Sequence, residues 1–368
     1  MKIPFLSFDY QDNLFRTQII ESVTNVIDSK WYILGENLRK FEIEYSTLNK
    51  ISYTVGVANG LDALIISLKA LNITKGDEVI VPANTYIATW LAVSAVGAIP
   101  IPVEPDINTN NINIELIQNH INSKTKAIIP VHLYGLPCDM NHIMKIAYDN
   151  NLYVIEDNAQ AHFAKCDDQM TGTFGHINAT SFYPGKNLGA IGDAGAITTN
   201  NINFYEFVLK YRNYGSNIKY YNDIKGINSR LDEIQASILR VKLNYLDLIT
   251  NQRISIAQEY TKLLQDVKEI KLPKEFPNLK HVYHLYVIHC EERDELQKFL
   301  TKKNIGTLIH YPVPPHLQEA YRDLGYKIGS FPISEKLAKE CLSLPIYPGM
   351  KIEEIIYVVD SIKEFYNK

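Results

Sequence analysis

Lys186 is the residue of this chain that could do covalent chemistry. It ends the stretch SFYPGK, residues 181–186, and leads directly into NLGAIGDAGAITT. Gly189, Gly192 and Gly195 allow tight turns and a close approach of the backbone in this second stretch. A lysine placed there can form a Schiff base with an aldehyde cofactor if its surroundings lower its pKa enough to leave neutral amine. The alternative is a solvated loop residue, which is the usual state of lysines.

Asp157 is a second candidate, because it ends the apolar run LYVIED at residues 152–157. A carboxylate at the end of a buried strand needs a cationic or hydrogen-bonding partner. It could cap a following helix. It could also pair with a protonated pyridine nitrogen, which makes such a ring an electron sink.

An Asn-Gly turn at Asn59 and Gly60 separates a short apolar run from a helical pattern that continues to about Leu71. The free backbone amides at a helix N-terminus favour an anion, above all a phosphate. An ordinary strand-turn-helix junction capped by Asn59 also explains this turn. Together with Lys186 and Asp157, the turn indicates a site for pyridoxal 5'-phosphate.

Short apolar runs alternate with helical patterns through the first half of the chain. The runs are Val79–Pro82, Ile99–Val103, Ala127–His132 and Leu152–Asp157, and the helical patterns are Thr85–Val96, Ile112–Ile121 and Met140–Asn150. This alternation predicts an α/β fold with a parallel sheet, in which ligands bind beyond the carboxyl ends of the strands. Tyr86, Asp157, Gln160 and Lys186 are expected there. No GxGxxG or P-loop motif follows a strand, so a dinucleotide or P-loop site is not expected.

The chain is expected to divide into a large domain with an N-terminal arm, residues 1–248, and a small C-terminal α+β domain, residues 249–368. A long helical region, Leu231–Leu264, connects them. The other predicted elements are helices at Leu14–Ser29, Asp294–Lys303, Ile333–Leu342 and Ile352–Tyr366, and strands at Val282–Cys290 and Gly306–Tyr311. His281 and His284 would lie on opposite faces of the first of these strands, so they are interpreted as ordinary sheet residues and no metal site is expected.

Composition argues against several classes of protein. A chain of 368 residues with 46% hydrophobic residues can bury a large core. The net charge of -4 and the pI near 6.2 indicate no basic surface for nucleic acid. The 4 cysteines contain no CxxC pair, which fits free thiols in a reducing cytosol. We expect a cytoplasmic protein, because no apolar run is long enough to span a bilayer and the N-terminus turns polar too early for a signal peptide.

Five stretches in order along the chain resemble one family. They are NGLDAL, EDNAQAH, SFYPGKNLGAIGDAGA, RNYGS and NSRLDEIQA, beginning at residues 59, 156, 181, 212 and 228. In these motifs the chain is similar to the sugar-nucleotide aminotransferases of the DegT/DnrJ/EryC1/StrS family. The resemblance implies the fold-type-I architecture of pyridoxal phosphate enzymes, like that of aspartate aminotransferase: a mostly parallel sheet with a smaller C-terminal α+β domain.

The resemblance also implies roles for the matching residues. Lys186 is expected to bind pyridoxal 5'-phosphate as a Schiff base and then to act as base and acid, moving a proton between the cofactor and the substrate. Asp157 is expected to pair with the pyridine nitrogen, and Gln160 to bond the ring hydroxyl. The remaining expected cofactor contacts are stacking by Tyr86, phosphate binding by Gly60, Leu61 and Ser181, and a phosphate contact from Asn228 of a second subunit. The enzyme is therefore expected to be a homodimer with shared active sites. For Tyr86, an aromatic side chain filling a seam between helix and sheet is the alternative.

Three positions depart from the family pattern. Asn158 and Phe163 stand where the family usually has small residues, so the shape of the site beside the ring is in question. Leu61 replaces a threonine found in many members, which removes a hydroxyl from the phosphate site. Members that remove a sugar hydroxyl carry histidine in place of the lysine, so Lys186 favours transamination.

Further stretches most resemble the members that aminate carbon 3 of a dTDP-3-keto-6-deoxyhexose, with L-glutamate as the expected amino donor. They are PANTYIATWLAVS, VEPDINTNNI, PVHLYG, GINSRLDEIQ and IHYPVPPHLQ. The expected product is dTDP-3-amino-3,6-dideoxy-galactose or its glucose epimer, for an O-antigen or another surface polysaccharide. The residues expected to line the nucleotide-sugar groove are Tyr183, Lys219, Tyr221, Arg230, His310 and Tyr311. Cations can meet a diphosphate, and tyrosines can bond sugar hydroxyls or stack on thymine. Each of these residues, taken singly, could equally be an ordinary surface residue.

Two other functions stay open at this point. One is amination at carbon 4 of a nucleotide-linked 4-keto-6-deoxyhexose. The other is a catalytically silent protein that binds pyridoxal phosphate and acts as a regulator, against which the intact set of Lys186, Asp157 and Gln160 speaks.

Overall fold

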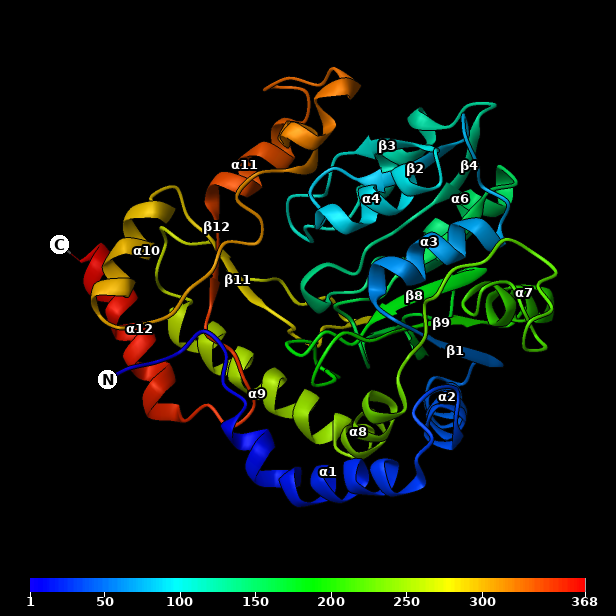
Figure 1. Cartoon of the computed structure of the whole chain (residues 1–368). Helices are drawn as coiled ribbons and strands as arrows, with labels where there is room; N and C mark the ends of the chain where they lie inside the picture. The colour runs from blue at the N-terminus through cyan, green and yellow to red at the C-terminus, as the bar shows by residue number, and fades with distance from the viewer. Residues whose placement is uncertain (368) are drawn as a thin grey trace.

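A mostly parallel sheet forms the centre of the chain in this computed structural model, which describes residues 1–367 (Figure 1). Its strand order is β1-β9-β8-β5-β4-β2-β3. The strands are β1 (Tyr53–Val57), β2 (Glu78–Pro82), β3 (Ile99–Val103), β4 (Thr125–Ile128), β5 (Tyr153–Asp157), β8 (Ile177–Ser181) and β9 (Gly195–Thr199). The predicted α/β fold is confirmed.

One strand runs against the predicted parallel direction. The pairs from β3 to β8 are parallel, whereas β9 pairs antiparallel with both β8 and β1. Residues 182–194, which join β8 to β9, contain no helix. A strand that returns without a crossover helix pairs antiparallel, and the loop that makes this return carries Lys186.

Alternate strand residues point into two separate cores, because the side-chain period of a strand is two. Val79 and Val81 of β2 belong to one core, and Ile80 between them belongs to the other. The first core contains helices α3 (Gly60–Ala70), α4 (Ile87–Ala95) and α7 (Ile202–Tyr211), and the second contains α5 (Ile114–Ile117) and α6 (Met140–Asp149). Helices therefore cover both faces of the sheet.

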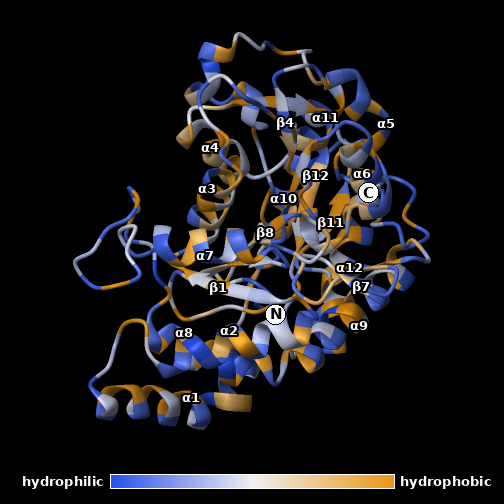
Figure 2. Ribbon diagram, turned by 90° about the vertical axis from the view of Figure 1, so that its right-hand side faces the viewer, coloured by the Kyte–Doolittle hydropathy of each residue, from blue (hydrophilic) through white to orange (hydrophobic). Residues whose placement is uncertain are grey.

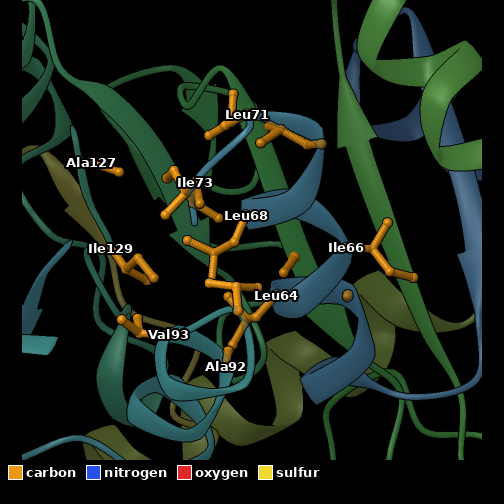
Figure 3. Close-up of a cluster of buried hydrophobic side chains, with 14 of the residues drawn as sticks. Leu64, Ile66, Leu68, Leu71, Ile73, Ala92, Val93, Ala127 and Ile129 are labelled. Carbon is orange, nitrogen blue, oxygen red and sulfur yellow. The ribbon is translucent and has the colours of Figure 1, made fainter. Parts of the chain in front are cut away.

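Figure 3 shows the first core in detail. Leu64 and Leu68 project from α3 toward Val93 of α4. Both leucines are essentially inaccessible to solvent. Burial of a leucine side chain stabilises a fold by about 2 kcal/mol, so this packing holds the N-terminus of α3 firmly against the end of the sheet.

Helices α1 (Asp9–Ser29) and α2 (Glu36–Asn49) both pack against α8 (Glu233–Leu243). The buried Glu233 carboxylate of α8 accepts hydrogen bonds at 2.9 Å from the backbone amides of Gly35, Asn37 and Leu38. It thus caps the N-terminus of α2 from a distant part of the chain. Helix α2 was not among the predicted elements, and α1 begins at Asp9 instead of near the predicted Leu14.

The C-terminal part is built on α9 (Leu246–Leu264), which begins in the core shared with α2 and α8 and ends in the C-terminal core. That core holds α10 (Arg293–Lys302), β11 (Tyr286–His289), β12 (Cys341–Leu344) and α12 (Ile352–Tyr366). The predicted helical region at Leu231–Leu264 is present as two helices, because residues 244–245 separate α8 from α9. The division into domains at residue 248 stays a prediction.

Two predicted strands differ from the observed ones. Residues 306–311 form no strand and make an isolated bridge between Leu308 and Ser343. His281 and His284 precede β11, so the interpretation as sheet residues is wrong. Their segment bonds elsewhere: the amide of Val282 donates to the carbonyl of Gly135 at 3.0 Å.

The remaining elements are short. They are β6 (Lys165–Cys166), β7 (Gln169–Met170), β10 (Leu279–Lys280), α11 (Pro332–Glu340), η1 (Gln118–His120), η2 (Leu133–Gly135), η3 (Pro315–Leu317) and η4 (Glu319–Leu324). The predicted helix at Ile112–Ile121 is thus only α5 followed by η1. None of the helices within residues 1–367 combines the length and the apolar character needed to cross a membrane.

Candidate active site

Asp157 is the last residue of β5, and its side chain is buried. Its Oδ2 accepts a hydrogen bond of 2.9 Å from the Thr89 hydroxyl, and its Oδ1 accepts one of 3.2 Å from the backbone amide of Ala159. Burial raises the pKa of Asp157 above its ordinary value, while Thr89, Ala159 and the charge of Lys186 favour the ionised form. A buried carboxylate in this position calls for a cationic partner.

Lys186 lies in the loop between β8 and β9, where its backbone amide donates to the carbonyl of Tyr183 at 2.8 Å. No described residue hydrogen-bonds to its ammonium. Burial lowers the pKa of Lys186 to about 8, although the nearby charge of Asp157 acts in the opposite direction. About a tenth of this lysine is therefore neutral amine at pH 7, which is the form that attacks a carbonyl.

Three histidines lie within electrostatic range of Lys186. Burial, followed by the charge of Lys186, lowers the pKa of His162 to about 3 and that of His310 to about 4. The same two causes, with Arg253, lower the pKa of His284 well below its ordinary value. All three imidazoles are therefore neutral, and Asp157 supplies the negative charge that Lys186 feels.

The N-terminus of α3 lies against the end of β8. The Asn59 side-chain oxygen accepts a hydrogen bond of 2.8 Å from the amide of Asp62, so the predicted cap is present. A Cβ on Gly60 would lie 2.6 Å from the Ser181 Cβ, so only glycine fits there. The first-turn amides of α3 and the Ser181 hydroxyl together offer an anion site. Leu61 packs against the core instead and adds no polar group.

Gln160 links two tyrosines from separate segments. Its Oε1 accepts a hydrogen bond of 2.6 Å from the amide of Tyr134, and its Nε2 donates one of 3.2 Å to the Tyr311 hydroxyl. The Tyr86 ring lies against Tyr311, with ring centroids 5.1 Å apart and planes tilted by 36°. Tyr86 is 53% exposed at the start of α4, so one side of its ring is open. The structure thus brings Tyr86, Gln160 and Tyr311 together.

His310, next to Tyr311, is held from the C-terminal part of the chain. Its Nδ1 lies 2.8 Å from the Ser343 hydroxyl of β12. Its backbone carbonyl accepts a hydrogen bond from the Tyr134 hydroxyl. Since Tyr134 is also bonded to Gln160, His310 and Tyr311 are connected to the predicted cofactor side of the site.

Half of the predicted groove residues lie in the segment between α7 and α8, apart from this cluster. Lys219 and Tyr221 are exposed, and the Lys219 ammonium lies 5.1 Å from the centre of the neighbouring Tyr220 ring. Arg230 donates to the Asn213 side chain at 2.9 Å. Asn228, also exposed, pairs its backbone with Asn213. No side chain of these residues, nor that of the exposed Tyr183, hydrogen-bonds with the side chain of Lys186 or Asp157 within residues 1–367. In Figure 2 the chain near α7 extends as a loop away from the body.

Sequence analysis missed three residues that shape the site. Thr89 lies four residues after Thr85, and the two hydroxyls are hydrogen-bonded to each other. Apart from this spacing, nothing in the sequence indicated that Thr89 contacts Asp157. Tyr134 entered only as part of PVHLYG. Glu156 is fully buried and accepts hydrogen bonds from His132 at 2.8 Å and from three amides of residues 172–175. It anchors the segment between β7 and β8, and it lies next to Asp157 in β5.

The two bulky departures from the family pattern are accommodated beside the site. Gly172 leaves room for Asn158, because a Cβ on that glycine would lie 2.7 Å from the Asn158 amide nitrogen. Phe163 adopts a positive φ of 69° and carries the Lys280 ammonium 4.4 Å from its ring centre. Neither side chain hydrogen-bonds with Lys186 or Asp157.

Four observations test whether these residues fit pyridoxal phosphate. A lysine with a lowered pKa can bond to the aldehyde, and a buried carboxylate can face the pyridinium. The glycine at the start of α3 leaves its amides open to a phosphate, and Tyr86 presents an exposed ring face. The donor set at Lys186, Asp157, Gly60 and Tyr86 therefore fits the cofactor.

The comparison with protein families decides the assignment. The model of the DegT/DnrJ/EryC1/StrS aminotransferase family matches residues 14–363. The chain belongs to the DegT/DnrJ/EryC1/StrS family. Members of this family are aminotransferases that depend on pyridoxal phosphate, so the chain is an enzyme of this type and the predicted cofactor is confirmed.

Relatives within the DegT/DnrJ/EryC1/StrS family match along their full length. The dTDP-3-amino-3,6-dideoxy-alpha-D-galactopyranose transaminase of Aneurinibacillus thermoaerophilus is 49% identical over 365 residues, 99% of either chain. The erythromycin biosynthesis sensory transduction protein EryC1 of Saccharopolyspora erythraea is 45% identical over 363 residues, also 99% of each. The crystal structure of DesV from S. venezuelae in complex with a ketimine intermediate superposes with a TM-score of 0.98 at 42% identity, covering 100% of this chain and 99% of DesV.

Proposed function

We propose that this enzyme transfers an amino group from L-glutamate to carbon 3 of a dTDP-3-keto-6-deoxyhexose, giving dTDP-3-amino-3,6-dideoxy-galactose or its glucose epimer. The single observation that carries the chemistry is the half-buried Lys186, lowered in pKa near the Asp157 carboxylate. The choice of sugar rests on the 49% identity to a transaminase named for the 3-amino-3,6-dideoxy-galactose product. Carbon 4 of a related nucleotide sugar is the nearest alternative.

Each polar group of the site has a defined task in this proposal. Pyridoxal phosphate, when bound, supplies a ring that accepts electrons from the substrate carbon and carries the amino group between donor and acceptor. Asp157 holds positive charge at the buried end of the site, and the Thr89 hydroxyl keeps its carboxylate in place. The Lys186 amine takes a proton from one substrate carbon and returns it to another atom, which requires a pKa near the working pH. Ser181 and the amides of α3 hold the phosphate.

The groove for the sugar nucleotide is proposed to be completed by a second copy of the chain. Within residues 1–367 the side chains of Lys219, Tyr221, Arg230 and Asn228 make no hydrogen bond with Lys186 or Asp157, and in this proposal a symmetric partner brings them to the site. Large apolar side chains support an interface: Ile20, Ile27, Trp31, Tyr32, Ile33 and Leu34 are exposed. Light scattering after gel filtration should give twice the chain mass of 42.0 kDa.

We also propose that the enzyme works in the cytoplasm. The four cysteines are free thiols, which fits a reducing cytoplasm. The destination of the amino sugar in a surface polysaccharide stays a prediction.

A second candidate function is regulatory, because EryC1, at 45% identity, is named a sensory transduction protein. Such a role needs no turnover, so Lys186 and Asp157 would serve binding alone. Mixing the loaded protein with L-glutamate separates the two functions. A change in the cofactor absorbance supports transamination, and an unchanged spectrum supports the regulator.

The deciding experiment is product NMR with the two 3-keto dTDP-6-deoxyhexoses, of galacto and gluco configuration, in separate reactions with L-glutamate. We expect an amine on carbon 3 from one of them. The Lys186→Ala protein is the control for non-enzymatic amination. If neither 3-keto sugar reacts while glutamate still changes the cofactor absorbance, the substrate assignment is wrong, and the 4-keto sugars become the next to test.

A further inference from the structure

Tyr134 connects Gln160, on the proposed cofactor side of the site, to His310, on the proposed sugar side, through its backbone amide and its side-chain hydroxyl. Its backbone amide donates to Gln160 Oε1 at 2.6 Å, and its hydroxyl donates to the backbone carbonyl of His310. Gln160 in turn donates to the Tyr311 hydroxyl at 3.2 Å. These bonds close a ring that runs from Gln160 through Tyr134 to His310 and Tyr311.

The backbone of Tyr134 is held in a conformation that side chains rarely adopt. Its φ is 61° and its ψ is 2°, and the residue is 7% exposed. The neighbouring Gly135 has a φ of 97°, and a Cβ there would lie 2.9 Å from the His284 amide nitrogen. Such strained positions persist where the surroundings fix them and concentrate at functional sites. The turn is thus wedged between Gln160 and the segment that carries His284.

His310 and Tyr311 depend on this turn because their own segment lacks regular structure. Residues 306–311 form no strand, and the bridge between Leu308 and Ser343 is their sheet-like contact. The Cys341 thiol also approaches the His310 carbonyl, at 3.5 Å, but a thiol is a weak donor. The Tyr134 hydroxyl is therefore the strong hydrogen bond on this carbonyl.

We propose that Tyr134 is a positioning residue that fixes the His310–Tyr311 segment against Gln160 and so sets the binding of the sugar acceptor. This inference rests on the proposed function, in which His310 and Tyr311 line the sugar groove. It assigns the residue no contact with the substrate. It places the effect of Tyr134 on the sugar half of the reaction, because Lys186 and Asp157 make no hydrogen bond with Tyr134.

The test is Tyr134→Phe, which removes one hydroxyl and keeps the ring. We expect the KM for the keto sugar to rise about tenfold, the effect of leaving one buried acceptor unsatisfied. The rate at which L-glutamate changes the cofactor absorbance should stay within about twofold. Tyr260→Phe is the matched control, because the buried Tyr260 hydroxyl donates to the Pro345 carbonyl at 3.0 Å in the C-terminal core.

A second readout does not need the sugar at all. Amide hydrogen exchange of residues 308–313 in the cofactor-free protein should be faster in Tyr134→Phe than in the natural chain or in Tyr260→Phe. Faster exchange in a protein that aminates no sugar would leave the positioning role intact and refute the proposed function. Unchanged exchange with an unchanged KM, or equal losses in both half-reactions, would overturn the role of Tyr134.

Discussion

The surroundings of Lys186 and those of Lys219 differ in what holds them. Around Lys186, the groups that could bind the cofactor stand at the ends of β5, β8 and α3, where sheet pairing and core packing fix the backbone. Lys219 lies in a loop joined by single backbone bonds, such as that from the amide of Tyr214 to the carbonyl of Ile227 at 2.8 Å. One chain is therefore sufficient to position the residues of the cofactor site, whereas the residues proposed to bind the sugar nucleotide lie on loops.

The largest effect should come from Lys186→Ala. We expect turnover to fall by about 1,000-fold or more, because no other described group near the site offers a neutral amine as base. The amount of amino sugar formed, measured by NMR, checks this. Lys145→Ala is the control, since Lys145 forms an exposed pair with Asp149 on the surface. Substantial remaining activity in the Lys186 variant would remove this residue from the mechanism.

Gly60→Ala tests whether binding of the cofactor depends on the close packing of α3 against β8. The new Cβ would lie 2.6 Å from the Ser181 Cβ, so either α3 or β8 must shift. Overpacking of this kind costs about 1–3 kcal/mol, and we expect pyridoxal phosphate to bind about tenfold more weakly. Equilibrium dialysis measures the affinity of the variant for pyridoxal phosphate. Gly76→Ala is not a suitable control, because Gly76 has a positive φ of 92°. Gly185→Ala serves as the control, because a Cβ there would make only ordinary van der Waals contacts, the shortest at 3.5 Å.

The pH dependence of the reactivity of the Lys186 amine gives a further test of the cofactor site. In the cofactor-free protein, acylation of this amine should rise with pH around a midpoint of about 8, because the neutral fraction grows as the ammonium loses its proton. Asp157 raises the pKa of Lys186, so Asp157→Asn should move the midpoint to lower pH and increase labelling at pH 7 up to about tenfold. Peptide mass spectrometry over a pH series measures both. A midpoint that moves upward would contradict the assigned geometry.

Lys219→Ala should have the smallest effect. The side chain is exposed, and exposed charge contacts contribute about 0–1 kcal/mol, so we expect the KM for the sugar nucleotide to rise at most about fivefold with kcat unchanged. Steady-state kinetics at two salt concentrations measure this, and the difference should shrink at higher salt. A large fall in kcat would mean that the loop belongs to the chemical centre and that the two sides do not differ.

The sequence by itself determined most of the central elements, and it identified the candidate residues for the cofactor site. Apolar runs bounded by turns predicted β2, β3 and β5 nearly to the residue, and the Asn59 cap and the position of Asp157 followed from local rules. Such features depend on neighbours in the chain, since strand alternation, caps and turns act over a few residues.

Only the tertiary structure decided the features that join distant segments. Glu233 caps α2 across the chain, Asn244 and Tyr245 divide a helical pattern that continues on either side, and β9 reverses direction because its loop lacks a helix. Tyr134 meets Gln160 and His310 through hydrogen bonds whose partners are far apart in sequence. No local pattern encodes such pairs, because the free energy that selects them comes from packing and hydrogen bonds between distant segments, which form only as the chain folds.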